Sequence, residues 1–255
     1  MELLTIVKVG GGILEDTESL DAFLKDFSLI AGRKVLVHGG GRSATKLAER
    51  LGVESKMING RRITDAETLK IITMVYGGLI NKNVVAKLQA LKLDAVGMTG
   101  ADKNIILSQK RPVKEVDYGY VGDVKEVNAN ALFDLLSQGI SPVLAPITHD
   151  GKGNLLNTNA DTIAGETAKA LAYNHQVRLI YCFEKPGVLM DEKDDTSIIP
   201  NLNQELYKEY KEQGIITGGM IPKIDNAFDA LSAGVKEVII TQAKAINTGK
   251  GTFIR

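Results

Sequence analysis

The sequence has one cysteine and no long run of apolar residues, and each absence excludes a class of protein. Cys182 cannot form a disulfide within the chain, and no metal-ligand spacing surrounds it, which suits a reducing compartment. We interpret it as a buried free thiol. The apolar run at residues 3–9 is too short for a signal peptide or a membrane span, so we expect a cytoplasmic protein.

The chain also lacks net charge, because 31 lysines and arginines balance 31 aspartates and glutamates. Without a global basic field, we expect neither nucleic acid nor an anionic membrane as a partner, and any bound anion must be held locally. The three histidines, His38, His149 and His175, are too dispersed to predict a metal site or a catalytic triad.

What is present is a large apolar fraction in an alternating pattern. With 255 residues and 44% hydrophobic side chains, the chain can bury a substantial core. Short β-branched runs are each followed by a segment of helical period, which predicts an α/β fold with a mainly parallel sheet. The first two units are a strand at 3–9 with a helix ended by Gly32, and a strand at 34–37 with a helix ended by Gly52.

A long helical pattern follows from Asp65, a plausible N-cap, to Leu91. It is interrupted only by Gly77 and Gly78, and two glycines inside a helix cost about 1 kcal/mol each relative to alanine. Two interpretations remain open: a kink, or the close approach of another helix, including one across a subunit interface.

The rest of the chain completes the α/β pattern. We predict a polar hairpin region at 119–123 and a seam at 173–175, which divides the chain into lobes 1–173 and 174–255 on one continuous sheet. The other predicted strands are 95–98, 142–145, 177–182 and 237–241, and the other predicted helices are 130–138, one opening at 157–161, 202–213 and 220–233.

Two glycine triplets stand at the ends of the first two strands, at residues 10–12 and 39–41. A glycine turn between a strand and a helix lets backbone amides approach a ligand, and the helix dipole favours an anion. Neither triplet reads as the dinucleotide or the P-loop fingerprint. The alternative interpretation of each triplet is tight packing.

Three charged residues are candidates for phosphate chemistry. Lys8 lies in an apolar strand, and Lys223 lies in the first turn of a helix, where the dipole disfavours a cation. Both positions indicate a nearby anion, unless the two side chains simply point to solvent. Asp161 is either a helix cap or the group that orients both lysines. Two lysines, an aspartate and glycine amides would suffice for phosphoryl transfer with Mg²⁺.

Two further residues are suited to binding a carboxylate substrate. Arg62 lies in a loop before a helix, and its guanidinium is shaped for a bidentate contact with a carboxylate, although a solvated loop arginine is an equal alternative. Asn157 offers an amide to a substrate oxygen, or else holds its own turn. A carboxylate acceptor needs no general base, which favours it over an alcohol.

Five motifs in order resemble those of the acetylglutamate kinases in the amino acid kinase family, from the first strand to the C-terminus. They are Lys8-Val9-Gly10-Gly11-Gly12, His38-Gly39-Gly40-Gly41, Asn59-Gly60-Arg61-Arg62-Ile63-Thr64, Asn157-Thr158-Asn159-Ala160-Asp161 and Gly218-Gly219-Met220-Ile221-Pro222-Lys223. The arginine loop and the Asn-x-Asn-Ala-Asp turn separate this pattern from carbamate kinase and aspartokinase.

The resemblance implies an open αβα sandwich. It also implies that a phosphoryl group is transferred from ATP to the side-chain carboxylate of N-acetylglutamate, in arginine biosynthesis. The Mg²⁺ ion would be held by ATP and not by protein side chains. The resemblance also implies that Lys8 and Lys223 stabilise the phosphoryl group and that Asp161 organises them. The implied substrate-binding residues are Gly40, Gly41, Arg62 and Asn157. The implied phosphate- or nucleotide-binding residues are Gly10, Gly11, Gly12, Gly218 and Gly219. It further implies that lobe 1–173 binds the acylglutamate and pairs two subunits, and that lobe 174–255 binds the nucleotide.

Two departures from the family pattern shape the remaining expectations. Residues 183–188 read Phe-Glu-Lys-Pro-Gly-Val where the family commonly has Thr-Asp-Val before Gly-Val, so the adenosine contacts around Glu184 stay open. The first strand begins almost at Met1, without the additional helix of arginine-inhibited hexamers, so we expect a homodimer without arginine feedback. No motif reads the acyl tail, which leaves succinyl as an alternative to acetyl. Other acceptors (carbamate, aspartate or free glutamate) and a non-catalytic nucleotide sensor also remain as alternatives.

Overall fold

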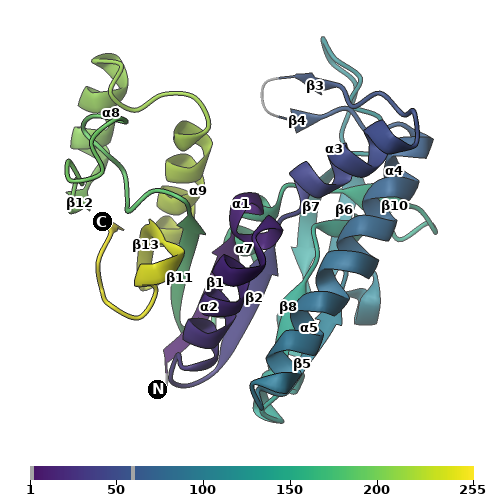
Figure 1. Ribbon diagram of the computed structural model, residues 1–255, viewed down its shortest axis with the longest axis horizontal. Helices are drawn as coiled ribbons and strands as arrows, with labels where there is room; N and C mark the ends of the chain where they lie inside the picture. The colour runs from purple at the N-terminus through teal and green to yellow at the C-terminus, as the bar shows by residue number, and fades with distance from the viewer. Residues whose placement is uncertain (1–2, 59–60) are drawn as a thin grey trace.

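The centre of the fold is an eight-stranded sheet, seen in a computed structural model that describes residues 3–58 and 61–255 (Figure 1). β1 (Leu3–Val9) lies in the middle and pairs in parallel with β2 (Lys34–His38) and β11 (Gln176–Phe183). The full strand order is β12 (Asn201–Leu202), β14 (Thr252–Ile254), β13 (Glu237–Gln242), β11, β1, β2, β8 (Ser141–Leu144) and β5 (Ala95–Met98). Among the described strands of this sheet, only the β13–β14 pair is antiparallel. The predicted mainly parallel α/β sheet is therefore confirmed.

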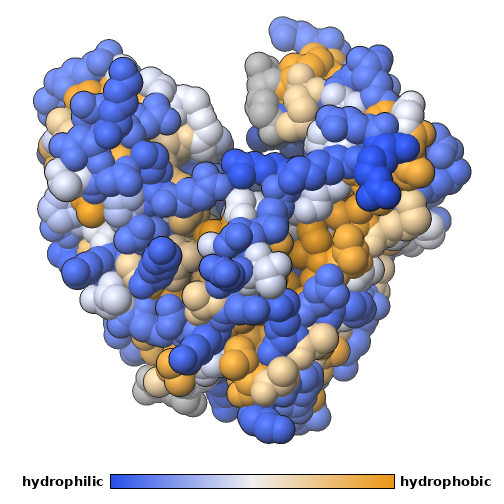
Figure 2. Space-filling model, viewed as in Figure 1, coloured by the Kyte–Doolittle hydropathy of each residue, from blue (hydrophilic) through white to orange (hydrophobic). Residues whose placement is uncertain are grey.

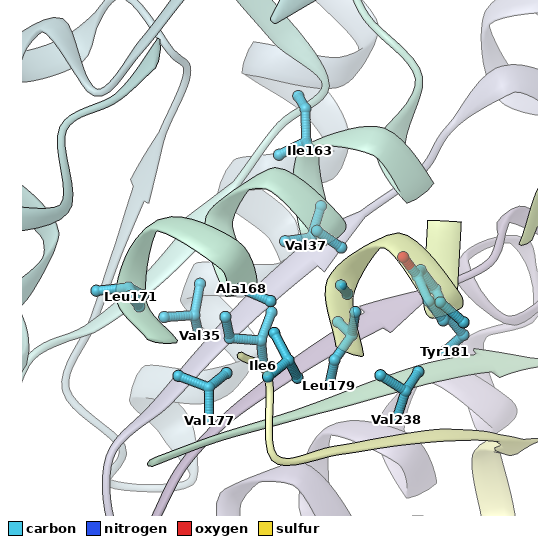
Figure 3. Packing of buried hydrophobic residues seen from close by; sticks show 14 of the residues in the cluster. Ile6, Val35, Val37, Ile163, Ala168, Leu171, Val177, Leu179, Tyr181 and Val238 are labelled. Atoms are coloured by element: carbon cyan, nitrogen blue, oxygen red, sulfur yellow. The ribbon is translucent and has the colours of Figure 1, made fainter. Parts of the chain in front are cut away.

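Helices cover both faces of this sheet, because its strands are apolar on both sides. Alternate residues of β1 enter two separate cores, with Ile6 in one and Val7 in the other. Figure 3 shows the first core, where Ile6, Val37 and Leu179 of three adjacent strands pack together under two helices. The first core contains α6 (Ala129–Ser137), α7 (Ala160–Ala172), α8 (Gln204–Glu212) and α9 (Met220–Ser232), and the second contains α2 (Thr17–Ser28), α3 (Gly41–Arg50) and the long helix described below.

The predicted N-cap Asp65 is confirmed, and Asp16 caps α2 in the same way. The Asp16 carboxylate accepts from Ser19 N at 2.8 Å at the start of α2, and Asp65 accepts from Thr68 N at 2.8 Å at the start of α4 (Ala66–Ile72). Gly32 does not end α2 as predicted, because the helix stops at Ser28 and the glycine lies in the turn that follows.

The long helix runs without a break from α4 through η1 (Thr73–Ile80) to α5 (Asn81–Ala90), but η1 is a π-helix. Asn81 N donates to the carbonyl of Tyr76, five residues earlier, instead of four. A side chain at Gly77 would meet ordinary van der Waals contacts, and one at Gly78 would meet none within 4 Å. The glycines therefore accompany a change of helix type and no sharp kink within the described chain.

A second, smaller set of strands stands beside the main sheet and was not predicted in full. It consists of β10 (Leu155–Asn157), β9 (Ile147–His149), β6 (Ile106–Lys110) and β7 (Gly122–Val127), in that order, and a separate two-stranded pair is formed by β3 (Met57–Ile58) and β4 (Arg61–Arg62). The region 119–123 contains the end of the connection between the antiparallel strands β6 and β7 and the first two residues of β7. It is not wholly polar surface, because Val121 and Gly122 are buried.

The molecule is hollowed along one edge. In Figure 1, α8 and α9 stand on one side of a gap and β3 and β4 on the other, and Figure 2 shows a depression at the same place. The carboxyl ends of β1 and β2 lead to this edge. In open parallel sheets, ligands bind beside the carboxyl ends of the strands. Across residues 3–58 and 61–255, no helix has the length and apolar character needed to cross a membrane.

Candidate active site

Lys8, Asp161 and Lys223 meet at the carboxyl end of β1. Both ammonium groups contact the one carboxylate: Lys8 Nζ lies 2.7 Å from Asp161 Oδ1, and Lys223 Nζ lies 2.7 Å from Asp161 Oδ2. Lys8 and Asp161 are each only 8% exposed. The structure thus brings together the three residues predicted to handle the phosphoryl group, from three different elements.

The side-chain directions follow from local structure. Lys8 shares its face of β1 with Leu4 and Ile6, and that face packs on α7 and α9. An outward-pointing edge-strand lysine is therefore wrong as an interpretation. Asp161 does not cap α7, because Asn159 is the N-cap and accepts from Asp161 N at 2.7 Å and from Thr162 N at 3.1 Å. With Asn159 as the cap, the Asp161 carboxylate remains available to the lysines.

The three charges do not balance, since two cations share one anion. Burial alone would raise the pKa of Asp161, but Lys8 and Lys223 outweigh it and hold that pKa at about 2. The carboxyl group is therefore ionised at neutral pH, and the cluster keeps one net positive charge in a poorly solvated place. Such a charge favours a further anion.

A cavity of about 430 Å³ lies beside this cluster, under the second glycine turn. The start of α7 lines it through Asn159, Ala160 and Thr162. The four predicted substrate-binding residues also line it: Gly40, Gly41, Arg62 and Asn157. The described chain places Gly218 and Gly219 elsewhere, directly before α9, in the other lobe.

The Arg62 side chain is buried and held by several hydrogen bonds. The alternative interpretation, a solvated loop arginine, is therefore wrong. Its Nη1 donates to Ser55 Oγ at 2.8 Å, and its Nη2 donates to Gly41 O at 2.9 Å and to Thr45 Oγ1 at 2.8 Å. A guanidinium has five N–H groups, so about two remain for a ligand. The preceding residues of this motif, Asn59 and Gly60, lie outside the described residues.

Asn157 ends β10, and its side chain donates a hydrogen bond from Nδ2 to Thr64 Oγ1 at 3.0 Å. Thr64 is fully buried and follows the arginine loop. The contact therefore joins the two motifs that were predicted to hold the substrate, although they are far apart in the sequence.

The first glycine turn is only partly available to a phosphate. The amide of Gly10 donates to Cys182 O at 3.0 Å, so this amide already has an acceptor within the protein, and the expected binding of a phosphate at Gly10 stays a prediction. Gly11 begins the short helix α1 (Gly11–Glu15), and the space over its Cα is open. Over Gly12, the Glu184 carboxylate occupies the position that a side chain would take.

The second glycine turn requires its glycine for two reasons. Gly40 has φ of +154°, and a Cβ there would lie 2.6 Å from Ile80 Cδ1 and 2.8 Å from Tyr76 Cδ1. Any side chain at this position would be strained. Gly41 begins α3, so the turn presents its backbone to the cavity with a helix N-terminus behind it.

Sequence reasoning missed several residues that line the cavity. Arg111 and Asp123 form a bidentate ion pair at its mouth, and Tyr76 closes one wall. The pKa of Tyr76 is raised by burial, so its phenol stays neutral. Arg111 and Asp123 belong to the β6–β7 hairpin, and nothing in their local sequence indicates that this hairpin folds over the cavity.

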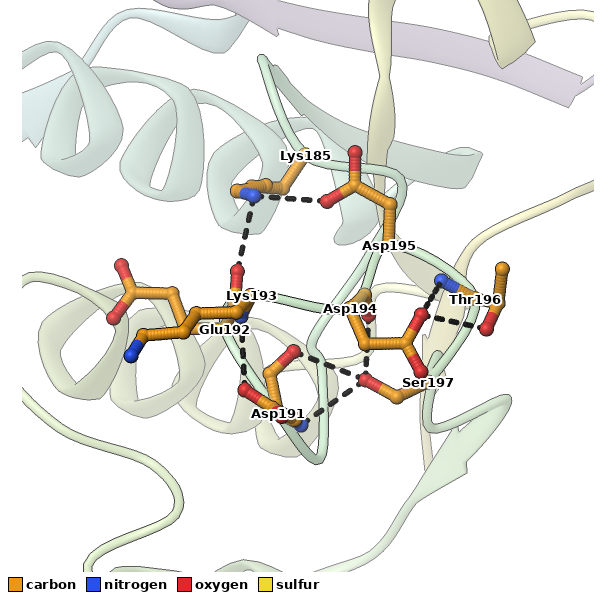
Figure 4. A network of polar contacts seen from close by, with 8 residues as sticks. All are labelled: Lys185, Asp191, Glu192, Lys193, Asp194, Asp195, Thr196 and Ser197. Carbon is orange, nitrogen blue, oxygen red and sulfur yellow. Dashed lines mark hydrogen bonds and ion pairs between the residues drawn. The ribbon is translucent and has the colours of Figure 1, made fainter.

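The segment after β11, which departs from the family pattern, joins the core through Val188 and also contains a polar loop. Figure 4 shows Lys185 contacting Asp195 and the carbonyl of Glu192, with Asp194 and Ser197 bonding their own turn. Glu184 precedes this loop and pairs with Arg42 of α3 at 3.1 Å, across the gap between the lobes. Both partners are well exposed, so this bridge adds little stability.

Comparison with known proteins agrees with the motifs. The model of the amino acid kinase family matches residues 4–242. The acetylglutamate kinase of Parabacteroides distasonis is 67% identical over 254 residues, covering 100% of both chains, and that of Phocaeicola vulgatus is 66% identical, covering 100% of this chain and 99% of its own. A solved protein of Streptococcus mutans, smu.665, is 29% identical with a TM-score of 0.83 and 98% of each chain covered. The chain therefore belongs to the amino acid kinase family.

Proposed function

We propose that the protein transfers the γ-phosphoryl group of ATP to the side-chain carboxylate of N-acetyl-L-glutamate, forming N-acetylglutamyl 5-phosphate in arginine biosynthesis. The observation that carries this proposal is the buried cluster of Lys8, Asp161 and Lys223 beside a cavity that contains Arg62 and Asn157. The curated relatives of full length bear the name acetylglutamate kinase, which supports the same reaction.

In this reaction a carboxylate oxygen of the substrate attacks the γ-phosphorus, and the bond to the β,γ-bridging oxygen breaks with its electrons leaving on ADP. We propose that Lys8 and Lys223 neutralise charge on the transferring group, while Asp161 keeps both ammonium groups in place. No general base is needed because the acceptor is already ionised. Catalysis then rests on positioning and on electrostatic stabilisation.

We propose that Gly11, Gly218 and Gly219 face the phosphates of ATP, because a side chain at any of the three would meet no atom within 4 Å. Mg²⁺ would arrive with ATP and would neutralise part of the negative charge on its phosphates, as in kinases generally. Both oxygens of Asp161 already face ammonium groups, so we do not assign Asp161 as a metal ligand.

The direct test is to trap the acyl phosphate with hydroxylamine. With ATP, Mg²⁺ and N-acetyl-L-glutamate, the hydroxamate should accumulate, and EDTA should stop it. If the protein phosphorylates carbamate, aspartate or free glutamate instead of the acylglutamate, it is another amino acid kinase. Binding of ATP without turnover on any of these acceptors would instead identify a nucleotide sensor and refute the proposal.

Replacing Arg62 by lysine should raise KM for the acylglutamate by about tenfold to a hundredfold and leave KM for ATP nearly unchanged. Lysine keeps the charge but loses the fork that binds a carboxylate bidentately and the three hydrogen bonds that hold the side chain. Steady-state kinetics with each substrate varied measures this split. Arg50→Lys, on the exposed end of α3, is the control and should match the wild type. Equal KM values for Arg62→Lys and the wild type would remove Arg62 from the substrate site.

A specific observation supports succinyl as a second candidate for the acyl group. Arg61, Arg111 and the Arg111 partner Asp123 line both the cavity and an adjoining hollow, whose other lining residues belong to the β6–β7 loop. Guanidinium groups there would suit the free carboxylate of N-succinyl-L-glutamate better than the methyl group of an acetyl tail. Comparing kcat/KM for acetyl- and succinylglutamate decides between them, and Arg111→Gln should lower only the value for the succinyl compound.

We propose that the chain forms a homodimer through the lobe 1–173. Met74 and Leu79 of η1 are 54% and 58% exposed, and the space over Gly78 between them is open. Figure 2 shows hydrophobic surface on this side of the molecule. Two such helices could approach closely at the glycine and bury these side chains.

Leu79→Lys should therefore convert the homodimer into a monomer, because it would bury a charge in the interface. Light scattering coupled to size exclusion measures the mass. Val113→Lys is the matched control, since Val113 is 63% exposed in a loop away from this helix and should leave the dimer intact. A wild-type monomer or hexamer, or an unchanged dimer in Leu79→Lys, would contradict the proposed interface.

A further inference from the structure

A chain of buried polar groups lies behind the second glycine turn. His38 is the last residue of β2, is 0% exposed, and directly precedes the turn. Asn81 is 1% exposed and opens α5. Asn81 Nδ2 lies 3.1 Å from His38 Nε2, and His38 Nδ1 lies 2.7 Å from Gly39 O. Neither residue lines the substrate cavity, so the reaction as described above does not use them.

The neighbours of Asn81 determine where the hydrogens are. Its Oδ1 accepts from the Lys82 ammonium at 3.2 Å, and its Nδ2 donates to the Val143 carbonyl at 3.0 Å. Because an amide NH₂ can only donate, His38 Nε2 must accept, and the ring hydrogen must lie on Nδ1. Nδ1 then donates to Gly39 O. Burial lowers the pKa of His38 to about 4, which keeps the ring neutral in this tautomer at physiological pH.

Holding the Gly39 carbonyl also fixes the next amide. The peptide unit is planar and trans, so the C=O of Gly39 and the N–H of Gly40 point in opposite directions. With the carbonyl directed at the buried imidazole, the Gly40 N–H points away from it. Residues 39–41 form the cavity wall at this point.

Gly39 N donates to Val9 O at 3.2 Å and Arg62 Nη2 donates to Gly41 O at 2.9 Å, so the His38 contact adds to these hydrogen bonds by holding the Gly39 carbonyl. Gly40 adopts φ of +154°, and glycine is the residue with the greatest freedom to leave such a conformation. The π-helix supplies the support: Tyr76 and Ile80 pack against Gly40, and Asn81 follows one turn after Tyr76. Gly97 makes room for Asn81, since a Cβ there would lie 1.9 Å from Asn81 Oδ1. π-Helical segments frequently occur at functional sites.

We propose that His38 and Asn81 are positioning residues that orient the Gly40 amide toward the reacting carboxylate or phosphoryl oxygens in the cavity. The π-helix η1 is the element that seats Asn81 against His38. This inference rests on the proposed phosphorylation of an acylglutamate, and it assigns a role to two residues that do not touch the substrate. Hydrogen-bonded chains of this kind rigidify a site when every member has its partner.

The test compares two isosteric replacements of the same residue. His38→Asn places an amide nitrogen where Nδ1 stands and can still donate to Gly39 O, whereas His38→Leu has the same shape and no donor. We expect His38→Asn to retain kcat/KM for N-acetylglutamate within about fivefold of the wild type. We expect His38→Leu to lose about tenfold to a hundredfold, with KM for ATP changed less than about twofold, since misplacing one group by 1 Å can have an effect of that size.

A loss of activity supports the inference only if the variant protein is folded. Circular dichroism and thermal unfolding show whether each variant folds. If His38→Leu does not fold, His38→Gln replaces it, because its longer amide reaches Asn81 and not Gly39 O, and it should show the same loss. The inference would be overturned if His38→Asn and His38→Leu had equal kcat/KM for N-acetylglutamate. It would also be overturned if a variant lost kcat/KM equally for N-acetylglutamate and for ATP. A wild-type protein inactive on every acylglutamate would instead refute the proposed function.

Discussion

Replacing Lys8 by methionine is expected to lower kcat by about a hundredfold to a thousandfold, because one of the two cations that face the transferring phosphoryl group is lost. The fold should survive, since Asp161 keeps its hydrogen bond from Lys223 at 2.7 Å and the buried cluster changes from one net positive charge to none. Steady-state kinetics at saturating ATP and acylglutamate measures the effect on kcat.

Lys34 provides a matched control for this change. It is a second buried lysine, 6% exposed, on the neighbouring strand β2, but its ammonium donates to the Ser28 and Ile30 carbonyls at the opposite end of the sheet. Lys34→Met should lower the free energy of unfolding by about 1 to 2 kcal/mol and leave kcat unchanged. A Lys8→Met enzyme with full activity would exclude Lys8 from catalysis. Equal losses of kcat in both variants would show that any buried lysine has this effect.

The sequence alone predicted an anion beside Lys8 because a charged residue inside an apolar strand has few explanations, and the role of Lys8 in phosphoryl transfer stays a prediction. The same reasoning found Lys223, whose place in the first turn of a helix is unfavourable without an anion. In both cases the local pattern contains the conflict, and the structure shows that one carboxylate on α7 resolves it. The parallel sheet was predictable for a similar reason, because alternating strands and helices are a local pattern.

Other parts depend on contacts that no local pattern records. Arg111 and Asp123 reach the cavity only because β6 and β7 fold over it, and here the sequence predicts only a polar hairpin region at 119–123. For the Gly77-Gly78 pair the sequence left a kink and an interface open, and the chain forms a π-helix without a sharp kink there, while the interface stays a prediction. Whether a glycine pair bends a helix or widens it depends on the groups packed around it, here Tyr76 and Ile80 on the second glycine turn.

His38 illustrates the same limit from the other side. Judged by sequence, it is an isolated histidine without metal-binding or triad spacing. Its partner Asn81 is 43 residues away in the chain, and the contact exists only because α5 packs beside β2 and β8. A buried polar pair of this kind becomes visible only when both partners and their hydrogen bonds are known.

The second large effect is expected from Asp161→Asn. This change leaves two ammonium groups near one neutral amide, in a place where the carboxylate is only 8% exposed. Removing one partner from a buried ionic cluster costs about 3 kcal/mol or more. We expect the variant to be less stable than the wild type by that amount at pH 7, with kcat reduced about a hundredfold because neither lysine is held in place.

The pH dependence of the stability difference between the wild type and Asp161→Asn identifies the cause of that difference. The pKa of Asp161 is about 2 in the folded protein and about 3.8 when unfolded, so its contribution is complete above pH 4 and is lost as the pH falls toward 2. That shift corresponds to about 2 kcal/mol. Urea denaturation of both proteins should therefore show a gap that is constant from pH 7 to pH 5 and narrows below pH 4. A gap that does not change with pH would mean that the aspartate acts by packing and not by charge.

ATP gives a complementary measurement on the same pair of proteins. Its phosphates would supply the negative charge that Asp161→Asn removes, so ATP should raise the Tm of the variant by more than it raises that of the wild type. This additional rise in Tm should become smaller as salt is added, because salt screens the attraction between the lysines and the phosphates. The effect of salt should be larger the more the phosphates are exposed to solvent. Identical ATP-induced shifts in the two proteins would place the phosphates away from Lys8 and Lys223, and with them the site of phosphoryl transfer.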